Sequence, residues 1–238
     1  MKTPHVRSIY LSALRRGLLI PLGLALFVLA PAPRAFAVSP PPDGGYPGGN
    51  TAEGNNALLS LTTGVWNTAV GDQALKNDTT GGGNTATGFQ ALFGTTAGKQ
   101  NTAYGSQALC FNTSGSFNTA VGYFALRGTS VGSNNTANGY QALTNDIEGQ
   151  SNTAVGSFAL SSNISGSDNT AIGSGALRVS LGSHNTAIGE RGFFSLGSGD
   201  FNTAFGVSSR RRNLRGQSCH LYRRKCRGCK CKQHHLDW

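Results

Sequence analysis

A short sequence motif, N-T-A-x-G-x-x-A-L, recurs along most of this chain and limits the folds that it can adopt. We call this motif the phrase. The copies begin at Asn50, Asn67, Asn84, Asn101, Asn118, Asn135, Asn152, Asn169, Asn185 and Asn202. The step is 17 residues, apart from one step of 16 between Asn169 and Asn185. A unit that recurs at a constant step buries its apolar face by stacking on its neighbours. The spacing therefore predicts a solenoid with one coil per copy.

Each copy contains two short segments with strand-like composition. Thr-Ala-x precedes the glycine and x-Ala-Leu follows it, and bends rich in Gly, Asn, Ser and Thr separate them. A helix is disfavoured because Gly and Asn recur in every turn's worth of chain and Ala-Leu shows no helical spacing. We predict an all-β fold, a parallel β-solenoid (β-roll) of about ten 17-residue coils with two short strands per coil and irregular ends.

The residues of the phrase have separate physical roles. The glycine suits a corner that needs positive φ or a close backbone approach. The leading asparagine can bond its own turn and its equivalents in neighbouring coils. The leucines form the main apolar stripe, and the alanine beside each leucine lets the walls approach. The structural repeat positions include Asn67, Gly71, Leu75, Asn101, Gly105, Leu109, Asn118, Gly122, Leu126, Asn152, Gly156 and Leu160.

The position before the glycine is apolar in seven of the ten copies, which indicates a half-buried or partner-facing site. A core of Ala, Leu and Val in such a narrow coil is thin. The apolar surface that it buries is small compared with the conformational entropy lost when many Gly-rich turns become ordered. We therefore expect additional apolar surface to be buried between chains.

The repeat domain, residues 50–207, lies between segments of different composition. Residues 1–37 have a basic leader, an apolar run over 17–30 and the cleavage site Ala35-Phe36-Ala37, as in a secretory signal peptide. An uncleaved anchor is the competing interpretation, but Pro21 interrupts a run that is shorter than the roughly 20 residues needed to span a bilayer. Residues 38–49 form a Pro/Gly linker.

The net charge of +10 comes from the two ends. The repeat domain has five basic and eight acidic residues, whereas ten basic residues lie between Arg210 and Lys232. The charge therefore gives no reason to expect nucleic acid as a partner of the repeat.

The tail, residues 208–238, has two interpretations. Cys226, Cys229, Cys231 and His234 offer metal-ligand chemistry among basic residues, although no second C-x-x-C pair stands at zinc-ribbon spacing. Alternatively, the tail is further repeat in a shifted reading frame. Reading one base later makes residues 225–238 compatible with N-A-G-V-A-N-A-S-N-T-T-W-I-G. The codon of Arg223, 17 residues after Gly206, can then give the next glycine.

No catalytic constellation is present in the repeat. Its one histidine, His184, precedes Asn185 in a turn and is expected to be exposed, so a Ser-His-Asp arrangement has no support. The acidic residues lie in turns without the spacing of a calcium loop. We expect no enzyme activity, no cofactor and no metal in the repeat domain.

The phrase N-T-A-V-G-x-x-A-L behind a signal peptide resembles the head repeats of trimeric autotransporter adhesins of the YadA-like, Hep/Hag type, and related exported bacterial N-T-A-x-G arrays. The resemblance covers residues 50–206. It implies a left-handed β-roll, three chains side by side and display at the cell surface for adhesion. The chain departs from these adhesins in its longer repeat and in lacking a coiled-coil stalk and a C-terminal membrane barrel.

The expected function is that of a secreted or surface-displayed bacterial structural or adhesive protein. Its expected partners are itself, as a homotrimer, and an unknown extracellular ligand, with no membrane-spanning segment after signal cleavage. The alternative is an ice- or carbohydrate-surface binder that uses the column of Thr51, Thr68, Thr85 and their equivalents.

Overall fold

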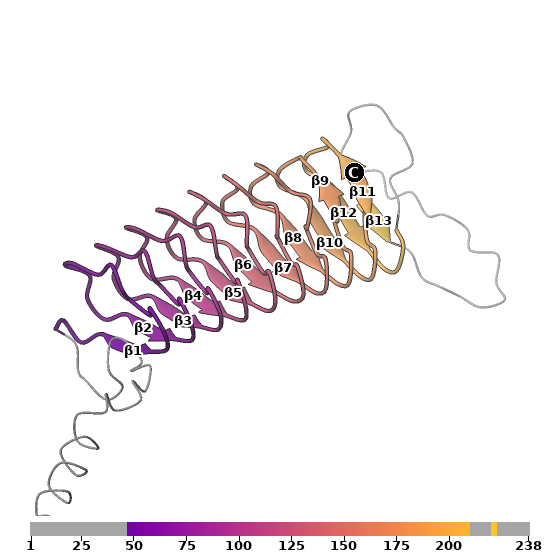
Figure 1. Cartoon of the computed structure of the whole chain (residues 1–238). Coiled ribbons are helices and arrows are strands. Elements are labelled where there is room, and N and C mark those ends of the chain that lie inside the picture. Colours follow the sequence, from indigo (N-terminus) through magenta and orange to yellow (C-terminus); the bar gives the residue numbers. More distant parts are fainter. Residues whose placement is uncertain (1–46, 210–219, 223–238) are drawn as a thin grey trace, which may run out of the picture. The chain divides into compact units, whose positions relative to one another are not determined.

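The structure, a computed structural model, describes residues 47–209 and 220–222 (Figure 1). The expected signal peptide, most of the linker and most of the tail lie outside these residues. The described part contains strands and no helix. Ten strands are the Thr-Ala-x segments of the ten copies: β1 (Thr51–Glu53), β2 (Thr68–Val70), β3 (Thr85–Thr87), β4 (Thr102–Tyr104), β5 (Thr119–Val121), β6 (Thr136–Asn138), β7 (Thr153–Val155), β8 (Thr170–Ile172), β10 (Thr186–Ile188) and β12 (Thr203–Phe205). The others are β9 (Val179–Ser180), β11 (Ser195–Gly197) and β13 (His220–Tyr222).

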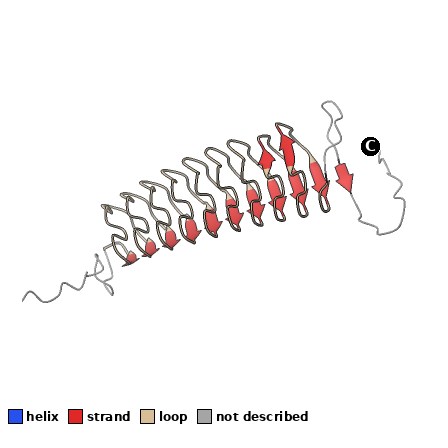
Figure 2. Cartoon of the chain, turned by 45° about the vertical axis from the view of Figure 1, so that its right-hand side comes forward, coloured by secondary structure: helices blue, strands red, loops and turns tan. Residues whose placement is uncertain are grey.

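The ten repeat strands and β13 stack as one parallel sheet in sequence order, so the predicted parallel β-solenoid is confirmed. Each threonine lies beside the threonine of the next coil and each alanine beside the next alanine, as Thr51 does with Thr68. Figure 2 shows these strands in one file along the stack. The strand β13 continues the step, because His220 pairs with Thr203, 17 residues earlier.

The 16-residue coil keeps this register because its missing residue falls in a turn. Thr186 pairs with Thr170 like any other neighbouring pair. In this coil Leu181 directly precedes Gly182. The leading asparagine still bonds this glycine, because Asn169 Nδ2 donates to the Gly182 carbonyl at 2.9 Å. The strand and the buried wall are therefore unaffected by the deletion.

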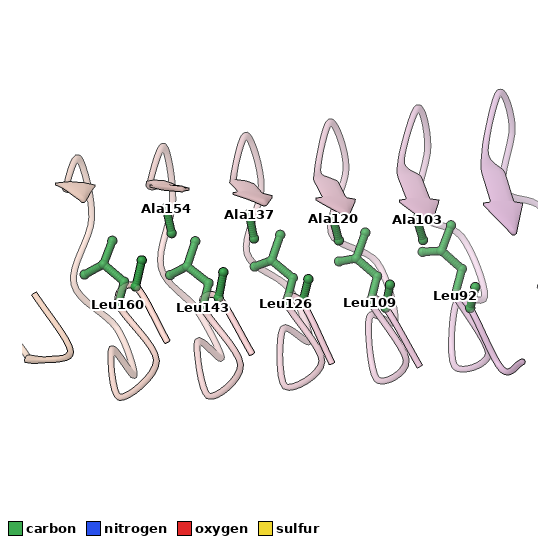
Figure 3. Packing of buried hydrophobic residues seen from close by; sticks show 14 of the residues in the cluster. Leu92, Ala103, Leu109, Ala120, Leu126, Ala137, Leu143, Ala154 and Leu160 are labelled. Carbon is green, nitrogen blue, oxygen red and sulfur yellow. The ribbon is translucent and has the colours of Figure 1, made fainter. Parts of the chain in front are cut away.

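The core consists of two facing walls of small and medium side chains (Figure 3). One wall is the alanine of each strand, such as Ala120, and the other is the Ala-Leu pair that follows the glycine, such as Ala125 and Leu126. All three are fully buried. At roughly 1.5–3 kcal/mol for each buried leucine, the leucine column is the main apolar contribution of each coil.

The expected second strand per coil is wrong for most of the stack. The x-Ala-Leu segment is a run of turns, and only the last coils have a second pairing, between β9 and β11. The reason is that Ala and Leu are consecutive and both buried. Successive side chains of a strand point to opposite faces, so a strand would expose one of the two. Here Leu126 adopts φ of 50° and Phe124 adopts φ of 59°. These conformations bend the chain so that the side chains of Ala125 and Leu126 both point inward.

The glycine of the phrase is required by close approach between coils. Gly122 has φ of 130°, and a Cβ at this position would lie 2.6 Å from the carbonyl oxygen of Gly139 in the next coil. No side chain fits there without moving two backbones apart. The glycine column therefore sets how tightly successive corners stack.

Candidate binding face and interior polar columns

The outer face of the sheet carries two regular columns of side chains, which we call the strand face. In each strand the central alanine points inward, and the threonine before it and the residue after it point outward. The threonine column runs through Thr51, Thr68, Thr85, Thr102, Thr119, Thr136, Thr153, Thr170, Thr186 and Thr203. Its members are exposed or half-exposed.

The second column of the strand face is the position predicted to be half-buried or partner-facing. Its apolar members keep much of their surface in solvent: Tyr104 is 62% exposed, Phe205 41% and Ile172 40%. Val70, Val155 and Ile188 are also exposed. The strand face thus presents a hydroxyl column beside a mostly apolar column, whose polar members are Glu53, Thr87 and Asn138.

The leading asparagines lie inside the coil and connect successive coils. Asn118 Oδ1 accepts a hydrogen bond from the backbone N–H of Asn135 at 2.9 Å. Asn118 Nδ2 donates to the carbonyl of Gly132 at 2.8 Å. The same pair of bonds recurs at Asn67, Asn101 and Asn152. These asparagines are fully buried, so they join coils and are not available to a ligand.

A second buried polar column was not anticipated from the sequence. It lies eleven residues after each leading asparagine and comprises Asp78, Thr95, Asn112, Thr129, Asp146, Asn163 and Ser180, all without exposed surface. Leu61 and Leu196 hold the same position at the two ends. The signal was a polar residue three positions before a glycine, D/N/T-x-x-G, which occurs in six of these seven coils and forms a local turn; in the 16-residue coil Gly182 follows Ser180 by two positions.

The two aspartates of this column are carboxyls in an apolar interior. Asp146 Oδ1 accepts hydrogen bonds from the Gly149 N–H at 3.1 Å and from Asn163 Nδ2 at 3.0 Å. Burial raises the pKa of Asp146 to about 7, against the lowering effect of these two bonds. Burial likewise raises the pKa of Asp78 to about 6, opposed by a bond from the Gly81 N–H. Asp78 Oδ2 and Asp146 Oδ2 are buried without a hydrogen-bond partner.

The candidate metal ligands Cys226, Cys229, Cys231 and His234 lie outside the described residues. Within residues 47–209 and 220–222, no group of three or more His, Cys, Asp or Glu side chains could hold a metal ion. The side chain of His184 is 48% exposed, its Nδ1 lies 3.9 Å from Asp168 Oδ2, and its ring stacks on Phe201 at 4.6 Å. It thus lies at the surface, as expected.

Comparison of the chain with protein-family models, with curated proteins and with solved structures gave no match. Among the residues that the structure describes, none belongs to a helix long and apolar enough to cross a membrane.

Proposed function

We propose that the chain is an exported, non-catalytic repeat protein with a structural or adhesive role at the cell surface, comparable to the head repeats of trimeric autotransporter adhesins. The observation that carries the proposal is the strand face. Ten strands in unbroken register present the same pair of columns, so any contact made by one coil can be repeated by the next. Repetition of a weak contact along a rigid scaffold is an efficient route to avidity.

The apolar column of the strand face favours self-association. Val155 and Ile172 lie on neighbouring coils and are both more than one-third exposed. Contiguous exposed apolar surface is characteristic of interfaces. The core of most coils is limited to two alanines and one leucine, so packing of strand faces between three copies would add the burial that a single chain lacks.

Sedimentation of the full-length chain tests the self-association. We expect a trimer for the wild type and a monomer for the double variant Val155→Asp, Ile172→Asp, because two buried, unpaired carboxylates oppose association. The matched control is Ser114→Asp, Ser165→Asp, which adds the same charges on exposed turns away from the strand face. The control is expected to stay trimeric. A monomeric wild type would contradict this part of the proposal.

Adherence is tested separately, in cells that display the chain. Deletion of residues 50–206 removes all complete copies of the phrase. We expect this deletion to abolish attachment of the cells to a matrix-coated surface. Unchanged attachment would exclude an adhesive role for the repeat.

A second candidate function rests on the threonine column. Ten threonines in register, separated by about 4.8 Å per coil, form a regular row of hydroxyl and methyl groups that could match an ordered surface such as ice. Thr102 and Thr136 are the exposed central members of the row.

Thermal hysteresis separates this candidate from the first. Ice binding requires shaped crystals and a freezing-point gap that disappears in Thr102→Tyr, Thr136→Tyr and persists in Thr63→Tyr, a control on an exposed turn. Without a freezing-point gap in the wild type, the threonine column is part of the self-association face only.

A further inference from the structure

A line of aromatic and basic side chains lies beyond the glycine corner in the coils that begin at Asn67 through Asn185, at positions five to ten residues after the leading asparagine. We call it the basic–aromatic edge. Tyr123 stacks on Phe124 with ring centroids 3.9 Å apart and on Tyr140 in the next coil at 5.7 Å. Tyr140 in turn contacts the edge of Phe158, one coil further, at 5.2 Å. Tyr123 and Tyr140 remain 44% and 47% exposed, so both side chains belong to a platform of stacked rings that is partly open to solvent.

Two arginines extend this platform in both directions. The Arg127 guanidinium lies 4.6 Å from the Phe124 ring and 4.7 Å from the Phe111 ring, and its Nε donates to Gln107 Oε1 at 3.1 Å. The Arg178 guanidinium lies 5.0 Å from the Phe158 ring and 5.4 Å from the Phe194 ring. Stacking on rings holds each planar group in place, and both arginines keep part of their surface in solvent.

Charge is segregated to this edge. Four of the five basic residues of the repeat domain lie on it, namely Lys76, Arg127, Arg178 and Arg191, and the fifth, Lys99, lies on another turn. Two acidic residues, Asp72 and Glu190, occupy the same positions towards the two ends of the edge, and none does so from Phe89 to Val179. Among the described residues, neither Arg127 nor Arg178 lies within salt-bridge distance of a carboxylate, and the one ion pair joins His184 to Asp168. The middle of the edge therefore offers positive charge that the described residues do not neutralise.

We propose that the basic–aromatic edge binds an acidic polysaccharide, with sugar rings against Tyr123 and Tyr140 and acid groups at Arg127 and Arg178. The apolar C–H face of a sugar ring packs on an aromatic ring, and a planar guanidinium pairs with a carboxylate or sulfate through two parallel hydrogen bonds. The inference rests on the proposed surface role, for which it supplies the class of ligand.

The spacing of the cations distinguishes this ligand from a nucleic acid. Arg127 and Arg178 are 51 residues apart, which is three steps of 17, and Lys76 precedes Arg127 by the same 51 residues. Three coils correspond to about 14 Å. A strand of duplex DNA carries a phosphate about every 3.4 Å, so most of its charges would lack a partner here. A polyuronic acid carries one acid group per sugar, so fewer of its charges lack a partner over this distance, and the sugars between the paired groups can contact Tyr123 and Tyr140.

The test uses the full-length chain and alginate, a polymer of uronic acids, with dextran as the neutral polymer and oligodeoxythymidine as the nucleic acid. Binding is measured by calorimetry at fixed ionic strength. We expect binding of alginate, much weaker binding of oligodeoxythymidine and no binding of dextran. The ten basic residues between Arg210 and Lys232 also attract polyanions, so only variants that keep this segment are compared.

Arg178→Gln is paired with Lys99→Gln, since each removes one positive charge from the repeat domain. Loss of a charge-assisted pair is expected to weaken alginate binding about tenfold in Arg178→Gln. Lys99→Gln is expected to bind like the wild type. Tyr123→Ser, Tyr140→Ser keeps every charge and is expected to lose at least as much affinity. Melting followed by circular dichroism confirms that each variant is folded.

Three results would overturn the inference: no alginate binding by the wild type, equal losses in Arg178→Gln and Lys99→Gln, or stronger binding of oligodeoxythymidine than of alginate. None of them bears on the self-association of the strand face, which is measured by sedimentation. A failure of the ligand assignment is therefore distinguishable from a failure of the proposed function.

Discussion

The fold depends on residues held in conformations that most side chains avoid. Leu75, Leu109, Leu126 and Leu160 all have φ near 50°, a left-handed conformation that costs roughly 1–2 kcal/mol per residue. Full burial of each leucine, worth roughly 1.5–3 kcal/mol, offsets this cost. Because the free energy gained by burial offsets the cost of positive φ, a large apolar side chain can occupy a position that would otherwise favour Gly or Asn.

Replacement of the corner glycine tests the close approach between coils. In Gly122→Ala the new Cβ would meet the Gly139 carbonyl, and we expect the free energy of unfolding to fall by about 2–4 kcal/mol. Gly197→Ala is the matched control, because Gly197 also has positive φ but nothing lies within 4 Å of a Cβ there. It is expected to lose only about 1–2 kcal/mol. Equal losses in denaturant titrations would show that φ alone, and not contact between coils, selects glycine.

At the scale of the element, several of the turns after the leucine are held by a buried side chain of the same turn. Asp78 and Asp146 accept the N–H of the glycine three residues later, as Asp78 Oδ1 does for Gly81 at 2.8 Å. Asn112 and Asn163 instead donate from Nδ2 to the carbonyl of that glycine, at 3.0 Å and 2.8 Å. Short polar side chains suit this position because they reach the backbone of their own turn. A carboxyl differs from the others in that it can ionise in a site that disfavours charge.

The two buried carboxyls predict that stability falls as pH rises. The pKa of Asp146 is raised from 3.8 to about 7 in the folded state, so between these values the folded chain binds more protons than the unfolded chain. The stability from the neutral carboxyl is therefore complete below about pH 4 and is lost as pH approaches 7, by roughly 4 kcal/mol at most. Denaturant titrations at pH 4, 6 and 8 measure this loss.

Replacement of each aspartate by asparagine distinguishes the contributions of the two carboxyls to the pH dependence of stability. Asp146→Asn is expected to be more stable than the wild type at pH 8 and to lose most of the pH dependence, since Asn112 and Asn163 already occupy the same column. Asp78→Asn is expected to remove a smaller part, because the pKa of Asp78 is raised only to about 6. If Asp146→Asn were less stable than the wild type at pH 8, the charged carboxylate would have to be stabilising.

At the scale of the whole molecule, the solenoid has contacts almost entirely between neighbouring coils. Within the described residues, each strand pairs only with strands of the neighbouring coils, so stability is close to a sum over coils and their interfaces. The two sides of the stack also differ in character. The strand face is uncharged along most of its length, whereas the basic–aromatic edge carries the unpaired cations.

Removal of one full coil tests this modularity. Deletion of residues 119–135 joins Asn118 to Thr136 and restores the phrase, so we expect a folded chain whose melting temperature falls by only a few degrees. Deletion of residues 119–126 removes about half a coil and leaves the following wall out of register. This variant is expected to lose cooperative melting by circular dichroism. Similar melting of the two variants would mean that register between coils is not what stabilises the stack.

The register between strands of neighbouring coils follows from the amino-acid sequence alone. The constant 17-residue step places Thr on Thr and Ala on Ala, because only that alignment stacks each apolar position on its own equivalent. The positions of the ten Thr-Ala-x strands and the buried leucine column follow from the same repetition. Local repetition sufficed because nearly every contact is made between adjacent coils.

Which of the non-repeating residues are buried, and which lie on the same edge of the solenoid, becomes evident only in the folded chain. The Ala-Leu segment turns rather than extends because two consecutive buried side chains need positive φ at leucine, which a composition pattern does not reveal. The sequence placed Asp78 and Asp146 in turns without indicating that they are buried, and the basic–aromatic edge is spread over several positions of the phrase. Stacking of coils brings Arg127, Tyr140 and Arg178 onto one edge, although a full coil or more of chain separates some of them.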